Sequence, residues 1–254
     1  MSSGPRPALE TRGLCKSFGA LTVADRIDFR LDAGVRHALI GPNGAGKTTF
    51  VNMLTGRLAP SAGHVLLGGQ DVTRLSQAAR VKRGLGRTFQ ITTLFRGMSV
   101  LDNIALSVAE RHGVAGHLWR PASTYARVRD EAIELLTLLG LETDAGQRVV
   151  DLPYGKQRLV EIAIALGLKP TVLLLDEPAA GVPKLESDRI LQALLERLPR
   201  DIAILIIEHD MELVFRFAQR ITVLVQGEVL CEGTPAQIVD DARVHQAYLG
   251  ERRA

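Results

Sequence analysis

A glycine-rich segment near the N-terminus has the spacing of a phosphate-binding loop. It fits the pattern GxxxxGK[ST] and ends in Lys47 and Thr48. In such a loop backbone N–H groups surround phosphate oxygens, and the following helix adds its positive dipole end. Lys47 is expected to reach the β- and γ-phosphates, and Thr48 to ligate Mg²⁺. The segment expected to bind a nucleotide comprises Gly41, Pro42, Asn43, Gly44, Ala45, Gly46, Lys47, Thr48 and Thr49.

Two adjacent carboxylates follow an apolar run later in the chain. Asp176 and Glu177 come directly after residues 172–175, whose pattern indicates a buried strand. Open α/β sheets bind ligands at the carboxyl ends of their strands, so Asp176 is expected to hold Mg²⁺ through water. Glu177 is placed to orient and deprotonate an attacking water. Such a pair alone is common in proteins, but after a phosphate-binding loop it predicts nucleotide hydrolysis.

Apolar patterns indicate the elements that position these groups. Residues 35–40 are expected to form a strand that ends at the loop, and residues 48–58 the helix that follows it. Ile27, Phe29 and Leu31 alternate with polar residues, and a hairpin is expected over 62–72. Strand patterns at 172–175, 202–207 and 221–225 alternate with helical patterns at 185–197 and 211–218. This alternation predicts a parallel sheet covered by helices.

Residues 91–165 differ in character from the rest of the chain. Helical spacing occurs at 100–110, 124–139 and 157–168, with a loop expected at 111–122. We therefore expect one domain over 8–254 of the α/β P-loop NTPase class. Its nucleotide-binding core and antiparallel β subdomain occupy 8–90 and 166–254, and an inserted helical subdomain occupies 91–165.

Composition limits the classes of function. The 31 Lys and Arg residues exceed the 28 Asp and Glu residues by only three, which does not by itself argue for nucleic acid but suits an anionic membrane surface. Cys15 and Cys231 form no CxxC pair, so neither a disulfide framework nor a zinc site is expected. No stretch reaches the roughly 18 apolar residues of a membrane span. Any membrane process would require other chains to cross the bilayer.

Residues 152–166 read LPYGKQRLVEIAIAL and stand just before the strand that ends in Asp176. With this segment the chain resembles the ATPases of ABC transporters, from Phe18 to Leu249. The resemblance implies a signature loop that caps the γ-phosphate bound by a second subunit. That loop maps to Leu152, Pro153, Tyr154, Gly155 and Lys156, of which the last three are expected to bind the nucleotide.

The same resemblance implies roles for three further residues. Gln90, in GRTFQ, matches a glutamine near Mg²⁺ and the γ-phosphate, and His209, in IIEHD, matches a histidine that steadies the γ-phosphate. Phe18 matches an aromatic residue that stacks on adenine. The expected cofactors are ATP and Mg²⁺. The expected catalytic residues are Glu177, His209, Lys47 and Gln90, and the expected metal-site residues are Thr48, Gln90 and Asp176.

Two prolines depart from the family pattern. Pro153 stands where the usual signature LSGGQ has serine, so the hydroxyl contact to phosphate is lost, while a proline in the first helical turn leaves the fold possible. We hypothesise that Lys156 supplies compensating charge. Pro183 stands where the D-loop usually has aspartate, which removes the usual contribution of that loop to water positioning.

Within the superfamily, YGxQRxxEIAxAL, DEPAAG and AYLGE resemble the ATPases of importers for branched-chain amino acids and related polar solutes. GRTFQ and the loop at 111–122 favour the longer of that system's two ATPase types. An ATPase of lipopolysaccharide export shares a similar ending but has a signature closer to GGERRR. ABC ATPases that act on DNA or ribosomes carry coiled coils, zinc inserts or fused halves, and a GTPase needs a motif such as NKxD; this sequence has none of these.

The resemblance also implies partners. These are a second ATPase subunit, transmembrane permease subunits and, through the permease, a solute-binding protein, with no nucleic acid. The location implied is the cytoplasmic face of the inner membrane. Residues 91–101 include Leu94, Phe95 and Met98, an apolar set that we expect to contact a transmembrane subunit.

Overall fold

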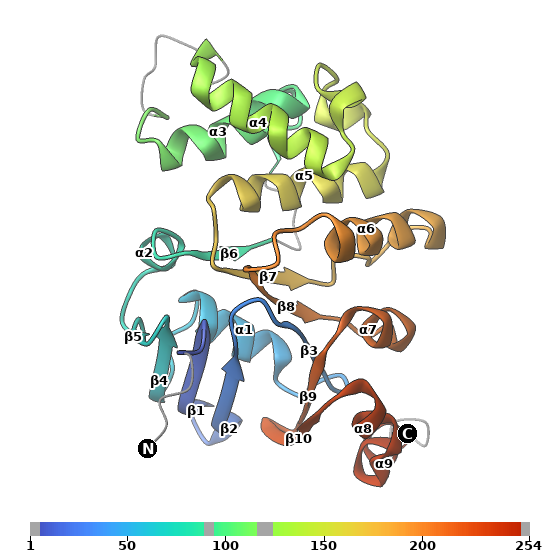
Figure 1. Ribbon diagram of the computed structural model, residues 1–254. Coiled ribbons are helices and arrows are strands. Elements are labelled where there is room, and N and C mark those ends of the chain that lie inside the picture. The colour runs from blue at the N-terminus through green and yellow to red at the C-terminus, as the bar shows by residue number, and fades with distance from the viewer. Residues whose placement is uncertain (1–5, 89–93, 116–123, 250–254) are drawn as a thin grey trace. The chain divides into compact units, whose positions relative to one another are not determined.

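The computed structural model describes residues 6–88, 94–115 and 124–249 (Figure 1). The chain divides into two compact units. The first comprises Met1–Leu85, Thr171–Leu175 and Arg200–Ala254, and the second comprises Gly86–Pro170 and Asp176–Pro199. Residues 176–199, which the sequence places with the core, therefore group with the helical segment. The predicted subdomain boundaries at 90/91 and 165/166 remain predictions.

An antiparallel sheet lies in the first unit. Its strand order is β2-β1-β4-β5. Ile27, Phe29 and Leu31 are all buried, since alternate residues of a strand face the same side. This confirms the half-buried strand and the hairpin that the sequence predicts. The strands are β1 (Leu9–Phe18), β2 (Leu21–Leu31), β4 (Ala62–Leu67) and β5 (Gln70–Asp71).

A second sheet has the order β10-β9-β3-β8-β7-β6. Strand β3 runs parallel to both β8 and β9, while β10 pairs antiparallel with β9. The parallel arrangement predicted for these strands is confirmed. Every residue of β7 and β8 is buried, which explains their continuous apolar sequences. The strands are β3 (Arg36–Ile40), β6 (Leu85–Arg87), β7 (Val172–Asp176), β8 (Ala203–Ile207), β9 (Arg220–Val225) and β10 (Glu228–Gly233).

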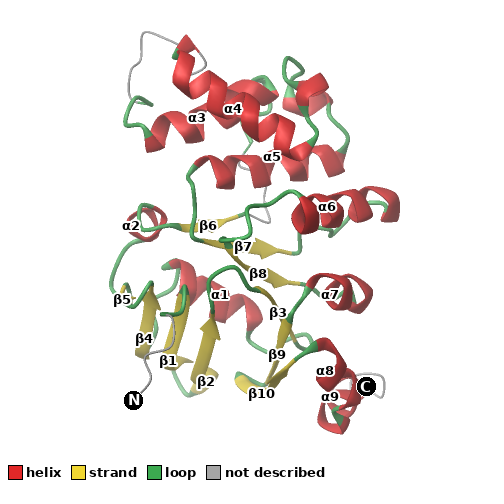
Figure 2. Cartoon of the chain, viewed as in Figure 1, coloured by secondary structure: helices red, strands yellow, loops and turns green. Residues whose placement is uncertain are grey.

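The core of the first unit is a continuous cluster of buried apolar residues. Phe29 of β2 and Phe50 of the first helix pack edge to face with ring centroids 5.6 Å apart, and Leu39 and Leu205 belong to the same cluster. This packing fixes the first helix, α1, against the strands. The helices of this unit, drawn red in Figure 2, are α1 (Lys47–Thr55), α2 (Gln77–Val81), α7 (Met211–Phe217), α8 (Pro235–Asp240) and α9 (Ala242–Leu249).

The second unit is built mainly from helices. Three of them pack on one another through buried apolar residues such as Ile104, Val108, Leu136 and Val160. Ser99 caps the first of these helices by accepting a hydrogen bond from the Asp102 N–H at 3.0 Å. The helices that the sequence predicts here are confirmed. The elements are α3 (Val100–Arg111), α4 (Ala126–Leu139), α5 (Tyr154–Gly167), α6 (Lys184–Glu196), and the short 3₁₀ turns η2 (Glu142–Asp144) and η3 (Val149–Asp151).

Candidate nucleotide site

The glycine-rich loop connects the buried end of β3 to the start of α1. Gly46 is the N-cap of α1 with a φ of 96°, and a Cβ there would lie 2.7 Å from the Val23 carbonyl oxygen. Only glycine fits this position without strain. Since a glycine cap has no side chain, it cannot accept hydrogen bonds from the first N–H groups of α1 through a side chain. An anionic group such as a phosphate fits this helix start.

Lys47 places its charge on the loop itself. Its ammonium group donates to the carbonyl oxygens of Gly41 and Pro42 at 2.5 and 2.8 Å. The side chain therefore curls back along the loop instead of extending into solvent. Thr48 is exposed, and so is Asn43. The segment offers a cation, backbone donors and a hydroxyl within a few residues, which fits a polyphosphate.

The carboxyl ends of three parallel strands meet at this edge of the first unit. Leu39 of β3 pairs with Ile207 of β8, and Ile40 pairs with Val223 of β9. The loop after β3 and His209, two residues beyond β8, therefore emerge from neighbouring strands. The His209 side chain is 69% exposed, and its backbone N–H donates to the carboxylate of the buried Glu208 at 3.2 Å. The structure thus brings His209 to the edge that carries the loop.

Phe18 ends strand β1 in the same unit. Its ring is half-exposed, and the Lys16 ammonium lies 5.0 Å from the ring centroid. An exposed aromatic face beside a cation has the properties needed to stack on a base.

Asp176 and Glu177 belong to the second unit. The Arg87 guanidinium donates to an Asp176 carboxylate oxygen at 2.8 Å, and both side chains are more than nine-tenths buried. Glu177 has a φ of 46°, a left-handed conformation that non-glycine residues rarely adopt. Such strain clusters at functional sites, where it aims a side chain. A carboxylate and a hydroxyl are oxygen donors of the kind that Mg²⁺ prefers, so Asp176 and Thr48 each carry a ligand of a type that fits this ion.

The predicted signature residues begin helix α5 in the second unit. Pro153 is the N-cap of this helix, with a φ of −54° and a ψ of 149°. Lys156 donates to both carboxylate oxygens of Asp144 at 2.8 Å, so its charge is shared with a buried acid. Arg158 donates to the Tyr154 hydroxyl and pairs with Glu161 at 2.8 Å. Burial raises the pKa of Glu161. The hydrogen bond from Arg158 and its positive charge lower this pKa, but by less.

Comparison with known proteins identifies the family. A profile of the ABC transporter family matches residues 24–180. The chain belongs to this family. A second profile, described as branched-chain amino acid ATP-binding cassette transporter, matches residues 228–254 of the cassette. Because family members hydrolyse ATP to drive transport, this ABC transporter cassette is an ATPase and one component of a membrane transport assembly.

The relatives of this cassette cover nearly its whole length. It is 39% identical to the high-affinity branched-chain amino acid transport ATP-binding protein BraF of Pseudomonas aeruginosa, over 97% of this chain and 99% of the relative. It is 38% identical to LivG of Escherichia coli, a protein of the same description, with the same coverage. A lipopolysaccharide export ATP-binding protein of Acidithiobacillus ferridurans is 35% identical, over 96% of this chain and 97% of the relative. The predicted resemblance to branched-chain amino acid transport ATPases is confirmed.

Solved structures confirm the fold. A crystal structure of an ATP-binding cassette in its ADP conformation is 29% identical, with a TM-score of 0.83, and covers 96% of this chain and 99% of that one. The predicted α/β P-loop class is therefore correct, and the cassette binds nucleotide. No helix in the described ranges 6–88, 94–115 and 124–249 is long and apolar enough to span a membrane.

The site residues are divided between the two units of the cassette. Gly41–Thr49, Phe18 and His209 lie in the first unit, and Asp176, Glu177 and the signature residues lie in the second. Gln90 lies outside the described residues. Sequence reasoning missed Arg87, although it stands in the quoted GRTFQ, and it missed Asp144 and Glu186, which bind Lys156 and Gly155. No local motif marked these partners.

Proposed function

We propose that this cassette is the ATPase of an importer for branched-chain amino acids or a related polar solute. The match of its last residues, 228–254, to the branched-chain amino acid cassette profile carries this proposal. The names and identities of BraF and LivG support it. The lipopolysaccharide export relative is the alternative, but at 35% its identity is lower.

Some of the proposed site residues, drawn from both units, would hold ATP and its metal ion. The N–H groups at the start of α1 bind the phosphates, and Lys47 leaves its loop carbonyls for the β- and γ-phosphate oxygens. Phe18 stacks on the adenine. Thr48, Asp176 and Gln90 are the residues that would hold Mg²⁺, and the bound ion would neutralise charge on the phosphate oxygens.

Glu177, Lys47 and His209 would carry out hydrolysis. Glu177 accepts a proton from the water whose oxygen forms the new bond to the γ-phosphorus. The bond from that phosphorus to the β–γ bridging oxygen breaks, and ADP leaves with the electron pair. Lys47 stabilises the charge on the transferring group, and His209 steadies the γ-phosphate.

Partners would complete the site. The signature residues of a second ATPase subunit cover the γ-phosphate, with Gly155 as a backbone donor and Tyr154 and Lys156 beside it. Permease subunits and, through them, a solute-binding protein link hydrolysis to transport at the cytoplasmic face of the membrane. Nucleic acid plays no part in this proposal.

The decisive variant is Glu177→Gln. Without its general base the cassette should lose about 10²–10⁴-fold in ATP turnover. It should still bind ATP and accumulate as a dimer, because the phosphate-binding loop is intact. Glu134→Gln, which neutralises an exposed carboxylate on α4 of the same unit, is the control and should hydrolyse ATP normally. Near-normal turnover by Glu177→Gln would remove Glu177 from this role.

The solute needs a separate measurement. The cassette is assembled with its permease and solute-binding protein, and ATP-driven uptake of radiolabelled leucine, isoleucine and valine into vesicles is followed. Uptake that stops in the Glu177→Gln assembly supports the proposal. An assembly that hydrolyses ATP but takes up none of the three amino acids would contradict the branched-chain assignment.

A further inference from the structure

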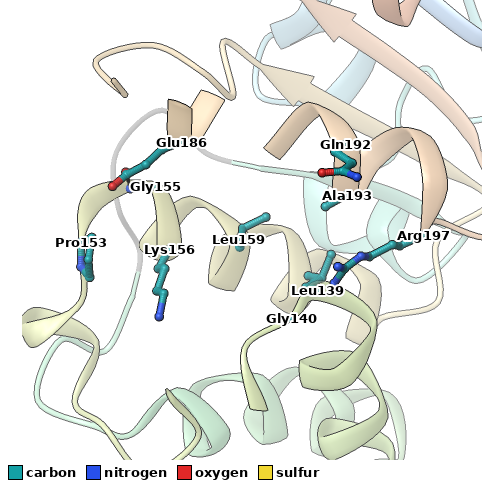
Figure 3. Close-up of a pocket in the computed structure, with 10 residues that line it drawn as sticks. All are labelled: Leu139, Gly140, Pro153, Gly155, Lys156, Leu159, Glu186, Gln192, Ala193 and Arg197. Carbon is teal, nitrogen blue, oxygen red and sulfur yellow. Dashed lines mark hydrogen bonds between the residues drawn. The ribbon is translucent and has the colours of Figure 1, made fainter. Parts of the chain in front are cut away.

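A cavity of about 390 Å³ lies within the second unit, beside the start of helix α5. Its lining includes Pro153, Gly155 and Lys156 from the signature segment, and Glu186 and Arg197 from α6 and its end (Figure 3). The close-up shows the Glu186 carboxylate directed at Gly155, while the Lys156 side chain extends away from it. An acidic side chain therefore stands at the start of the signature helix.

The contact between Glu186 and Gly155 is close. A Glu186 carboxylate oxygen accepts a hydrogen bond from the Gly155 N–H at 3.0 Å, across 31 residues of sequence. A Cβ at position 155 would lie 2.3 Å from that same oxygen. The carboxylate thus occupies the space that any other side chain would need. Any side chain at position 155 would therefore require the Glu186 side chain to shift.

The other charge at the start of α5 is also engaged. Lys156 donates to both oxygens of Asp144, whose side chain is 4% exposed. Pro153 has neither an N–H nor a hydroxyl to offer. An incoming anion at this helix start therefore meets the Glu186 carboxylate already bound to the Gly155 donor.

We propose that Glu186 is an autoinhibitory acceptor that holds the signature segment until two subunits close on ATP. This inference rests on the proposed function, in which the Gly155 N–H serves the γ-phosphate held by the partner subunit. One N–H cannot serve two anions at full strength, and a carboxylate beside a phosphate repels it. Glu186 must therefore leave when the dimer forms, and the adjoining cavity gives its side chain room to move. The contact raises the ATP concentration needed for closure.

The test is Glu186→Gln in a Glu177→Gln background, which keeps ATP unhydrolysed. The glutamine amide oxygen can still accept the Gly155 N–H, but the negative charge is gone. Hydrogen bonds to charged groups are about twice as strong as neutral ones, so the ATP concentration at half-maximal dimerisation should fall about fivefold. Dimerisation is followed by sedimentation velocity over an ATP·Mg²⁺ titration. Glu186→Ala, which removes the acceptor entirely, should lower the midpoint at least as far.

The control is Glu196→Gln, which removes the same charge from the exposed end of the same helix. Its midpoint should equal that of the background protein. An unchanged or higher midpoint for Glu186→Gln, in a variant with unaltered thermal unfolding, would overturn the proposal and make Glu186 a simple helix cap. Failure of the background protein itself to dimerise would instead contradict the proposed function.

Discussion

Lys47 holds its ammonium group on two carbonyl oxygens of its own loop, at 2.5 and 2.8 Å. These contacts keep the charge where the phosphates of ATP are proposed to bind. Carbonyl oxygens are neutral acceptors, whereas phosphate oxygens are charged. The lysine therefore makes stronger hydrogen bonds when its ammonium group moves from the carbonyl oxygens to the nucleotide. The loop therefore keeps the positive charge of Lys47 close to the proposed binding position of the ATP phosphates.

Lys47→Ala should weaken ATP binding by about 10–100-fold, the loss expected when one strong charged hydrogen-bond donor is removed. The equilibrium dissociation constant for ATP·Mg²⁺ is measured by isothermal titration calorimetry. Lys82→Ala, which removes an exposed lysine at the end of α2, is the control and should bind as the wild type does. Unchanged affinity in Lys47→Ala would mean that the glycine-rich loop does not bind ATP.

At the residue scale, some site residues could be predicted from the sequence and others could not. The proposed phosphate- and metal-binding residues follow local patterns, because loop, strand end and helix start are adjacent in the chain. Their supporting partners do not: Arg87 and Asp176 are 89 residues apart, and Gly155 and Glu186 are 31 apart. Such pairs exist only after folding, so no local spacing could have predicted them. Lys156 donates to Asp144 in this structure, so any charge that it supplies to a phosphate is shared with that carboxylate.

At the scale of elements, Glu131 joins three parts of the helical unit. It lies on α4, pairs with Arg111 and His112 at the end of α3, and faces Lys169, which follows α5, at 3.4 Å. Burial opposes its ionisation, but the hydrogen bonds from Arg111 and His112 and the positive charges around it outweigh this effect. Together they lower the pKa of Glu131 from its ordinary 4.5 to about 2.

Glu131→Gln should therefore lower the free energy of unfolding at pH 7 by about 1–2 kcal/mol, allowing for solvent screening. Because the folded-state pKa is the lower one, the stabilisation is complete above pH 4.5 and disappears as the pH falls toward 2. Urea unfolding of wild type and variant at pH 7 and pH 3.5 should show the difference shrinking. Asp130→Asn, at the exposed neighbour, should change little. A difference independent of pH would contradict this account.

Some elements could be predicted from sequence and others could not. The buried strands β7 and β8 have continuous apolar sequences, and α3 and α4 have helical spacing. Strand β1 escaped prediction because a register shift between Thr11 and Leu14, at Gly13 with a φ of 53°, breaks the alternation of buried and exposed residues. Strand β6 has only three residues, too few to show a period.

At the scale of the whole molecule, the proposed reaction needs both compact units. Lys47 belongs to the first, and Asp176 and Gly155 belong to the second. In the proposed reaction one nucleotide engages Lys47 and Asp176 of one subunit and Gly155 of its partner. The permease needs a separate surface of the cassette to respond to the closing of the two subunits. The predicted surface is residues 91–101, of which 94–101 are described.

Within this segment, Leu94 is buried and Met98 is half-buried, so they do not share the exposure of Phe95, which is 58% exposed. Asn103 holds the Phe95 backbone at both ends, accepting from its N–H at 2.9 Å and donating to its carbonyl at 3.1 Å. The ring is therefore presented to solvent from a fixed backbone. A pre-positioned aromatic side chain of this kind is typical of the residues that dominate binding energy at protein interfaces.

Phe95→Asp should prevent assembly with the permease, because it replaces this apolar contact with a charge that would be buried at the interface. Co-purification of permease and cassette measures the loss. Ile133→Asp, at an exposed apolar residue on α4 of the same unit, is the control and should assemble normally. A cysteine at position 95, in a background lacking Cys15 and Cys231, should cross-link to the permease. Full assembly and transport by Phe95→Asp would place the permease surface elsewhere.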